Sequence, residues 1–169
     1  ASACPHCGHK IGALENIPVL SYLFLRGKCK QCRAPISLRY PIVELTSGLL
    51  SAFAAAHFGY GWAAVGAILL IWALLALTFI DFDTQLLPDD LNYLILWLGL
   101  VAAAMGWTTV AVTSAVWGAV IGYLSLWLVY QVHYRLTGKQ GMGHGDFKLL
   151  AALGAWFGAE YLIALVLLS

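Results

Sequence analysis

Four cysteines near the start of the chain stand in two pairs with the spacing of a metal site. The pairs are Cys4-Pro-His-Cys7 and Cys29-Lys-Gln-Cys32. A turn of two intervening residues brings both sulfur atoms of a pair toward one ion, and four thiolates are a typical ligand set for zinc. Because four sulfur ligands leave no open position for water, the predicted zinc is structural and would drive folding of this short segment. The alternatives are reduced cysteines or a pair of disulfides.

Two aspartates stand at the edges of long apolar stretches and are the candidates for catalysis. Asp81 follows one stretch directly, and Asp146 directly precedes another. If the fold brings them together, they would share one proton; the charged carboxylate would activate water and the protonated one would polarise a scissile carbonyl. Gly143 and Gly145 are expected to allow positive φ and to leave room for another backbone beside Asp146. Asp146 is expected to begin a helix and Asp81 to end one.

Other charged residues near these stretches have structural alternatives to a site role. Asp89 and Asp90 follow Pro88, so helix capping competes with a catalytic role for them. Glu44 lies near the start of the first apolar stretch, and it is expected to be structural or to orient a substrate. Lys148 is expected to pair with Asp146 or another acid, or to extend to the membrane interface.

The composition shows which elements must position these residues. The chain has 169 residues, of which 62% are hydrophobic and 10% are charged, with net charge +1. Soluble domains carry about 25% charged residues, so a water-soluble globule is excluded. Long apolar runs exclude disorder, and the near-neutral charge argues against a nucleic-acid binder. The sequence therefore predicts an all-α polytopic protein of the lipid bilayer.

About five membrane spans follow from the uncharged runs. No Asp, Glu, Lys or Arg occurs over 45–80 or over 91–134. Since a spanning helix needs about 20 apolar residues, each run is divided at a turn, Gly59-Tyr60-Gly61 or Gly106-Trp107-Thr108-Thr109. The predicted spans are 40–58, 62–80, 90–106, 110–131 and 148–168. They form a membrane domain, 40–169, after a zinc-binding segment, 1–39.

The basic residues predict the orientation of these spans. With five spans, segments 1–39, 81–89 and 132–147 lie on one side of the membrane. All nine Lys and Arg lie in these segments or within one residue of them. The positive-inside rule places this side in the cytoplasm. The cysteines and both aspartates therefore face the same compartment, where the acids can meet.

Together these motifs resemble the type IV prepilin peptidases of bacterial inner membranes, over essentially the whole chain. The resemblance rests on the two cysteine pairs, Ala13-Leu-Glu-Asn-Ile-Pro18, Arg39-Tyr-Pro-Ile-Val-Glu44-Leu45, Asp81 with Pro88-Asp89, and Gly141-Met-Gly-His-Gly-Asp146-Phe-Lys148. The last motif contains the GxGD pattern shared with other intramembrane aspartyl proteases. Members usually begin with a further span and often continue past the fifth, so the chain is expected to be a truncated piece.

The resemblance implies a function for the named residues. Asp81 and Asp146 would be the catalytic pair, and Cys4, Cys7, Cys29 and Cys32 would bind zinc. The substrate would be a prepilin or pseudopilin whose basic leader is cut after Gly, and S-adenosylmethionine would methylate the new N-terminal amine. No fingerprint for that donor occurs, so methyl transfer rests on the resemblance alone. The four acids of residues 81–90 give this loop a net charge of −4, which would attract a basic leader.

Two other functions compete with proteolysis. An ion- or proton-coupled transporter would use Asp81 and Asp146 as relay groups, but relay acids usually lie near the middle of the membrane beside broken helices. A zinc-bearing membrane scaffold without chemistry would leave the glycine-rich motif at Asp146 unexplained.

Overall fold

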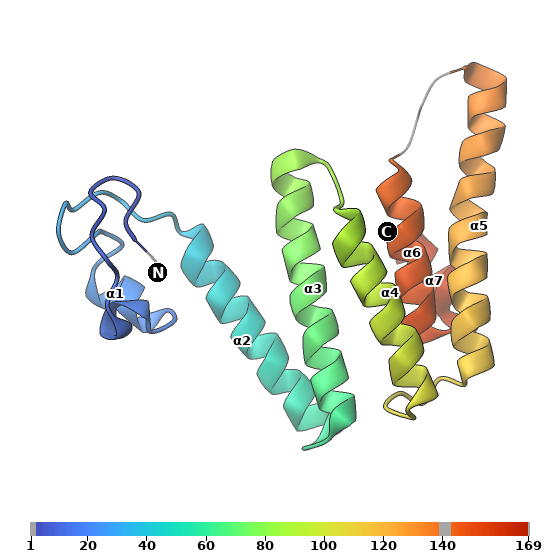
Figure 1. Ribbon diagram of the computed structural model, residues 1–169, viewed down its shortest axis with the longest axis horizontal. Coiled ribbons are helices and arrows are strands. Elements are labelled where there is room, and N and C mark those ends of the chain that lie inside the picture. Colours follow the sequence, from blue (N-terminus) through green and yellow to red (C-terminus); the bar gives the residue numbers. More distant parts are fainter. Residues whose placement is uncertain (1–2, 139–142, 169) are drawn as a thin grey trace. The chain divides into compact units, whose positions relative to one another are not determined.

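The computed structural model describes residues 3–138 and 143–168, and the chain divides into two compact units, one ending at Phe53 and one beginning at Ala54. Helices make up most of the second unit, whereas the first unit consists of turns and two short helices followed by the beginning of a long one (Figure 1). The described residues contain helices and no strands, in agreement with the all-α prediction. The elements are η1 (Ala13–Asn16), α1 (Leu20–Phe24), α2 (Arg39–Phe58), α3 (Trp62–Thr84), α4 (Asp89–Ala104), α5 (Val112–Thr137), α6 (His144–Phe157), η2 (Ala159–Tyr161) and α7 (Leu162–Leu168).

Three of the helices in the described part of the chain are long and apolar enough to cross a membrane. They are α2, α3 and α5, with 20, 23 and 26 residues. The helix α4 has 16 residues and α6 has 14, which is short of the roughly 20 that a perpendicular span needs. The two glycine-containing turns are confirmed, because α2 ends just before Gly59 and α4 ends just before Met105-Gly106. The count of five spans stays a prediction.

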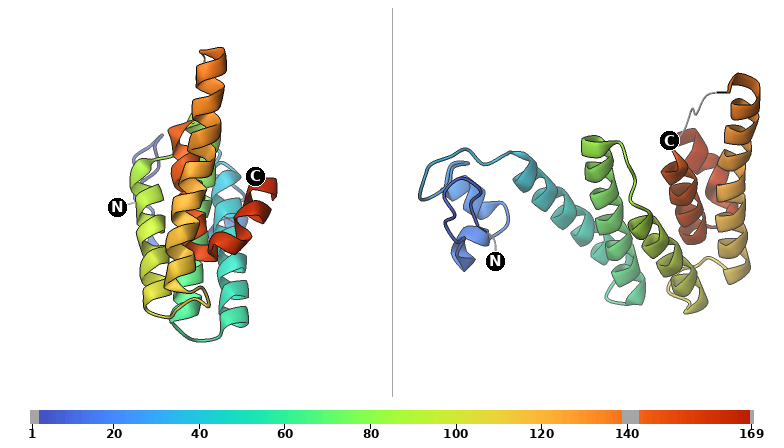
Figure 2. Two further views of the ribbon diagram at one scale, coloured as in Figure 1. Left: turned by 90° about the vertical axis from the view of Figure 1, so that its right-hand side faces the viewer. Right: turned by 45° about the horizontal axis from the view of Figure 1, so that its top comes forward.

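The predicted fifth span, 148–168, is not one helix. The helix α6 ends at Phe157, and Gly158 has φ 82° and ψ 169°, a conformation that breaks the helix. The chain then passes through η2 and changes direction into α7 (Figure 2). A Cβ at residue 158 would lie 2.6 Å from the Ser114 hydroxyl oxygen, so only glycine fits. Hydropathy could not reveal this break, because the residues on both sides are apolar.

Two helices extend beyond their predicted ends. The helix α3 continues past Ile80 to Thr84, so Asp81 lies inside its last turn and does not follow the helix. It stops where Gln85 adopts the left-handed conformation, with φ 51°, and donates its N–H to the Asp81 carbonyl at 2.7 Å. The helix α5 runs to Thr137 and ends at Gly138, which is also left-handed, as is common at helix ends. Charged and polar residues continue both helices because the ends lie outside the apolar core.

The central element of the second unit is α6. It packs against α4 and α5, and seven of its residues are buried. Trp156 is 7% exposed and donates its indole N–H to the Ile95 carbonyl at 2.9 Å. Its ring lies against Gly99, where a Cβ would meet it at 2.7 Å, and against Gly66 at 3.4 Å. The apolar residues that follow Lys148 in this short helix are thus explained by burial within the unit.

Small residues let α5 and α6 cross in close contact. A Cβ on Gly118 or Gly154 would collide with the other helix's backbone, and one on Gly122 would lie 2.8 Å from the Leu150 carbonyl oxygen. Gly118 and Gly122 are four positions apart and so face the same side of α5, as in the small-xxx-small pattern of membrane helices. This close crossing fixes the helix that carries Asp146.

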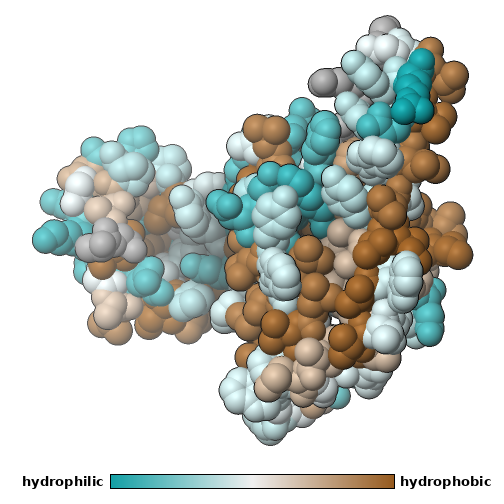
Figure 3. Space-filling model, turned by 45° about the vertical axis from the view of Figure 1, so that its right-hand side comes forward, coloured by the Kyte–Doolittle hydropathy of each residue, from teal (hydrophilic) through white to brown (hydrophobic). Residues whose placement is uncertain are grey.

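The two turns of the second unit lie at one end, and the aspartates at the junction of α3 and α4 lie at the other. The rings of Trp62 and Trp107 stack with centroids 5.1 Å apart, which brings together the start of α3 and the loop after α4. Asp81 and Asp89 therefore lie at the far end of the same two helices. Figure 3 shows apolar side chains over the middle of the unit and hydrophilic ones toward one end, as lipid exposure requires. Exposed apolar residues include Trp117, Leu124 and Leu128.

Candidate functional site

The four cysteines of the first unit converge on one point. Their sulfur atoms all lie within 4.8 Å of one another, with Cys4 and Cys32 at 3.8 Å and Cys7 and Cys29 at 4.0 Å. All four are free cysteines in this structure. A tetrahedral zinc ion with Zn–S bonds of about 2.3 Å separates its sulfur ligands by about 3.8 Å. The four sulfur atoms are therefore close enough together to hold one metal ion.

The backbone around the second pair repeats the backbone around the first, 25 positions later. In each, the first cysteine donates its N–H to the carbonyl five positions on, at 2.9 Å in both, and its own carbonyl accepts the N–H four positions on, at 2.9 and 3.0 Å. Each turn closes with a left-handed residue, Gly8 at φ 69° and Arg33 at φ 58°. Two equal turns thus present two sulfur pairs to one centre.

Backbone N–H groups prepare the first cysteine of each pair for metal binding. The N–H groups of Cys7 and His6 lower the pKa of Cys4 to about 7, and those of Cys32 and Gln31 lower the pKa of Cys29. The N–H of His9 lowers the pKa of Cys7, but desolvation and the adjacent cysteines outweigh it and raise that pKa to about 11. Neighbouring thiolates repel one another, and a bound cation would offset that repulsion.

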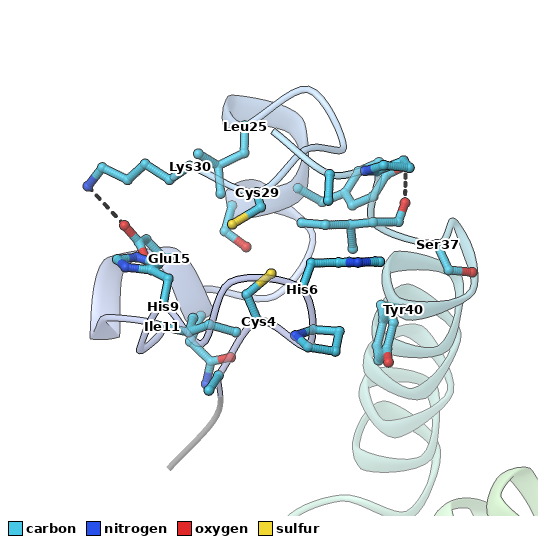
Figure 4. A pocket seen from close by; sticks show the side chains of 18 of the residues that line it. Cys4, His6, His9, Ile11, Glu15, Leu25, Cys29, Lys30, Ser37 and Tyr40 are labelled. Atoms are coloured by element: carbon cyan, nitrogen blue, oxygen red, sulfur yellow. Dashed lines mark hydrogen bonds and ion pairs between the residues drawn. The ribbon is translucent and has the colours of Figure 1, made fainter. Parts of the chain in front are cut away.

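Glu15 connects the two cysteine turns. Its carboxylate accepts from His9 Nε2 at 3.1 Å, in the first turn, and pairs with Lys30 Nζ at 2.9 Å, in the second (Figure 4). Lys30, the backbone N–H of Gly12 and His9 lower the pKa of Glu15 to about 2. Sequence reasoning assigned Glu15 no such role, because the connection depends on the folded turns.

A pocket of about 400 Å³ lies beside the cysteine cluster within the first unit. Figure 4 shows Cys4 and Cys29 on one side of it and Ser37 and Tyr40 on the other. Tyr22 and Glu44 also line it. The Glu44 carboxylate accepts the backbone N–H of Val19 at 2.8 Å, so its structural role is supported and it also faces a cavity. The sequence contained no sign of this pocket.

The second unit brings Asp81 and Asp146 into electrostatic contact. Asp81 lies in the last turn of α3, and Asp146 is the third residue of α6, as its predicted place at a helix start requires. Partial burial raises the pKa of Asp146, and the negative charge of Asp81 raises it further. The charge of Asp81 therefore acts on a carboxyl 65 positions later in the chain.

The glycines before Asp146 behave differently from their prediction. Neither Gly143 nor Gly145 has positive φ; Gly143 is extended, with φ −71° and ψ 142°. Close approach holds for one of them: a Cβ on Gly145 would lie 2.7 Å from the Leu87 Cβ, whereas one on Gly143 would lie 3.7 Å from Asp146 Oδ2. The atom that restricts residue 145 thus belongs to a side chain of the α3–α4 loop and not to a backbone. Gly141, the first glycine of the motif, lies outside the described residues.

An ion pair joins α4 to α6 beside this loop. Lys148 Nζ lies 2.5 Å from Asp89 Oδ2 and 5.3 Å from the centre of the Tyr93 ring. The prediction that Lys148 pairs with an acid is confirmed. The capping prediction for Asp89 and Asp90 is wrong in its position, because Pro88 occupies the N-cap and both acids stand in the first turn of α4. There they still favour the helix through its dipole.

One buried polar residue near this site was missed from the sequence. Asn92 of α4 is 1% exposed, and its side-chain N–H donates to the Gly145 carbonyl at 3.5 Å. A lone Asn within an apolar helix was the available signal. Its partner could not be foreseen without the packing of α4 on α6.

The chain is similar in sequence to known bacterial proteins that share one name. The chain is 56% identical over 168 residues to a prepilin leader peptidase/N-methyltransferase of Stutzerimonas stutzeri, and 55% and 51% identical over 168 residues to proteins of the same name from Pseudomonas aeruginosa and Neisseria gonorrhoeae. Each match covers 99% of this chain and 58% of the relative, so the chain spans somewhat over half the length of these relatives. No solved structure matches the chain.

Family models agree with these relatives in both units. The bacterial peptidase A24 N-terminal domain matches residues 1–58, which contain the cysteine cluster. The type IV leader peptidase family matches residues 68–169, which contain both aspartates. Since this second match covers more than half of the sequence, the chain belongs to the type IV leader peptidase family.

Proposed function

We propose that this chain is the peptidase part of a membrane aspartic endopeptidase that removes the basic leader from type IV prepilins or pseudopilins after Gly. The observation that carries the proposal is the electrostatic contact between Asp81 and Asp146, through which the charge of one raises the pKa of the other. Membership of a leader peptidase family favours this function over an ion-coupled transporter or a scaffold.

The pair would work as an acid and a base on one water molecule. Burial and the negative charge of Asp81 raise the pKa of Asp146, which favours its protonated form compared with an isolated aspartate. The ionised carboxylate takes a proton from water as its oxygen attacks the scissile carbonyl carbon, and the protonated carboxyl gives its proton to the carbonyl oxygen. When the tetrahedral intermediate collapses, the C–N bond breaks and the first carboxyl gives its proton to the leaving amine. The second carboxylate takes back the proton of the hydroxyl that becomes the new carbonyl, which restores one proton on the pair.

The acidic segment 81–90, which comprises the last turn of α3, the loop and the first turn of α4, would favour a basic leader. Asp81, Asp83, Asp89 and Asp90 all lie within ten residues, and all four are exposed. A site with one sign of charge raises the local concentration of an oppositely charged substrate. Added salt should therefore raise KM for a leader peptide more than it lowers kcat.

Cleavage of a peptide with a basic leader and a Gly-Phe junction, by the purified protein in detergent, tests the catalytic pair. Asp81→Asn and Asp146→Asn should each lower kcat by at least about a thousandfold, since loss of either carboxyl removes the proton transfers. Asp90→Asn makes the same charge change in the same acidic segment and should keep kcat within about twofold, with a higher KM. Full cleavage by Asp81→Asn or Asp146→Asn would end the proposal.

We also propose that Cys4, Cys7, Cys29 and Cys32 hold a structural zinc ion, which when bound supplies a cross-link between the two turns. The sulfur separations and the lowered thiol pKa values of Cys4 and Cys29 support this ligand set. The purified protein should contain one zinc per chain, and Cys29→Ser should lose it and unfold the first unit. A metal content well below one per chain would contradict the site.

We propose, from the relatives' names, that the full-length protein also methylates the new amino terminus with S-adenosylmethionine as donor. When bound, this donor supplies a methyl group on a positively charged sulfonium. The pocket of about 400 Å³ in the first unit is lined by Tyr22, Tyr40 and Glu44. It fits the donor in size and chemistry, because the tyrosines offer rings for an adenine and Glu44 offers a carboxylate for a cation.

Donor binding is testable without any substrate. Tyr40 is 66% exposed and so contributes little to folding. Tyr40→Leu should weaken binding of S-adenosylmethionine to the purified chain by about tenfold in calorimetry. Tyr134→Leu, in the second unit, removes an equally aromatic side chain and should leave that binding unchanged. Equal binding by the two variants would exclude the pocket and leave the peptidase proposal standing.

We propose a bacterial inner-membrane location in which the cysteine cluster and the acidic segment 81–90 face the cytoplasm. The candidate spans and the relatives support a bacterial membrane protein. Six of the nine basic residues precede Tyr40 and none lies in the turns at 59–61 and 105–111, and this asymmetry carries the orientation. Reporter fusions that place the turn at Gly59-Gly61 in the cytoplasm would reverse it.

A further inference from the structure

Asn92 is a polar side chain in buried surroundings that are otherwise apolar. It is the one polar residue that is buried in the described part of the chain, at 1% exposed. Its neighbours in the α4 core include Ile95, at 1% exposed. An amide in such surroundings is unfavourable unless all of its hydrogen-bonding atoms have partners.

The hydrogen bonds of Asn92 do not satisfy its amide. The N–H donates to the Gly145 carbonyl across a long 3.5 Å, and Oδ1 is buried without a partner. Within residues 3–138 and 143–168, Thr108 Oγ1 is the one other buried side-chain atom in this condition. A long bond and an unused acceptor stabilise a fold less than a leucine of similar volume would. Stability therefore does not explain this residue.

Asn92 lies beside the start of α6, next to Asp146. Gly145 contributes its carbonyl to the peptide bond that joins it to Asp146, so the Asn92 amide contacts the peptide group that carries the catalytic aspartate. Leu87 presses on Gly145 from the α3–α4 loop, and the pair of Lys148 with Asp89 holds α4 to α6 nearby. Three contacts from one loop and one helix thus surround the first turn of α6.

We infer that Asn92 is a positioning residue, which orients the Gly145–Asp146 peptide and thereby the Asp146 carboxyl toward Asp81. This inference rests on the proposed peptidase function. The buried Asn92 side chain lies against the Gly145 carbonyl and so limits where that peptide can lie, and an error of about 1 Å at a reacting group costs about a hundredfold in rate. Sites often keep a polar group that the fold alone does not need.

Asn92→Leu separates positioning from folding. It should keep or raise the thermal midpoint, because it removes a buried unpartnered acceptor. It should also lower kcat by about tenfold with KM within about twofold, because orientation and not binding is lost. Thr108→Val is the matched control: it removes the other unpartnered buried oxygen at the opposite end of α4, and it should leave kcat unchanged. Asn92→Ala repeats the test if Asn92→Leu does not fold.

A measurement that needs no activity separates this inference from the proposed function. The Asp146 carboxyl carbon, followed by NMR, should titrate with a shifted midpoint in Asn92→Leu, because its position relative to the Asp81 charge changes, and with an unmoved midpoint in Thr108→Val. A midpoint that stays fixed in Asn92→Leu, or a loss of thermal stability that accounts for its lower kcat, would overturn the positioning role. If Asp146→Asn cleaves normally, the peptidase proposal fails, while this titration still decides whether Asn92 orients Asp146.

Discussion

Replacing Gly145 by alanine puts a measurable strain on the candidate catalytic site. The new Cβ would lie 2.7 Å from the Cβ of Leu87 and 3.4 Å from its Cδ1. Carbon atoms pack at about 3.5–4.0 Å, so the two residues must separate by about 1 Å. The Leu87 Cβ is fixed to the backbone, and a rotamer change cannot move it. The strain therefore passes to the α3–α4 loop or to the first turn of α6.

The expected cost follows from that displacement. Overpacking of a rigid contact costs about 1–3 kcal/mol of folding free energy. A shift of about 1 Å between reacting groups lowers the rate by about a hundredfold. We therefore expect Gly145→Ala to remain folded and to lose roughly two orders of magnitude in kcat for leader-peptide cleavage, measured in detergent beside its thermal midpoint.

Gly143→Ala is the matched control, because it makes the same change two residues earlier in the same motif. Its Cβ would lie 3.7 Å from Asp146 Oδ2, an ordinary contact, and Gly143 has a φ of −71° that alanine adopts freely. We expect kcat within about threefold of the parent, since an N-cap glycine is worth only about 1 kcal/mol or less over alanine. Leu87→Gly removes the obstructing Cβ and should partly rescue Gly145→Ala.

The reasoning would be refuted if the two alanine variants lost activity equally. It would also be refuted if Leu87→Gly gave no rescue, because the loss would then come from something other than contact with that loop. A double-mutant cycle on Leu87 and Gly145 expresses this as a coupling energy, which should exceed about 1 kcal/mol for residues in direct contact.

Three further predictions concern stability and charge. Arg33 in the second cysteine turn has a left-handed backbone conformation. Arg33→Gly should therefore raise the free energy of unfolding of the first unit, measured in the presence of a chelator, by up to about 1 kcal/mol. Gly8→Ala in the first turn should lower that free energy. Gly154→Ala forces α5 and α6 apart and should lower the thermal midpoint sharply; Gly48→Ala, where a Cβ meets nothing within 4 Å, should not. Glu15 should titrate near pH 2 by NMR, so the stability that it contributes is complete above its ordinary pKa and is lost as the pH falls toward that midpoint. A Glu15 midpoint at its ordinary value would contradict the link between the two turns.

Features that depend on composition or on short spacings were predictable from the sequence. The convergence of the two cysteine pairs was, because a turn of two residues leaves few places for the sulfurs. The ends of α2 and the start of α5 were too, within two residues, because glycine-rich turns interrupt uncharged runs. A helix beginning near Asp146 was predictable within two residues, because an apolar stretch follows that acid directly.

Features that depend on contacts between distant segments were not predictable. The break at Gly158 is one, since it depends on Ser114 filling the space of a side chain. The different constraints on Gly143 and Gly145 are another, because Leu87 approaches only one of them. The role of Asn92 depends on α4 lying against α6.

The sequence by itself determined that this protein is built from apolar helices, that a four-cysteine cluster precedes them, and that a pair of aspartates is available for chemistry. These properties follow from residue types and from separations of a few positions, which local geometry translates directly into structure. Only the tertiary structure decided that the charge of Asp81 acts on Asp146 and which side chains lie against the glycines that precede Asp146. It also decided which helices are long enough to cross a membrane. A separation of 65 positions along a chain carries no information on distance until helices pack, and here the packing of the short, buried α6 against α4 and α5 supplies it.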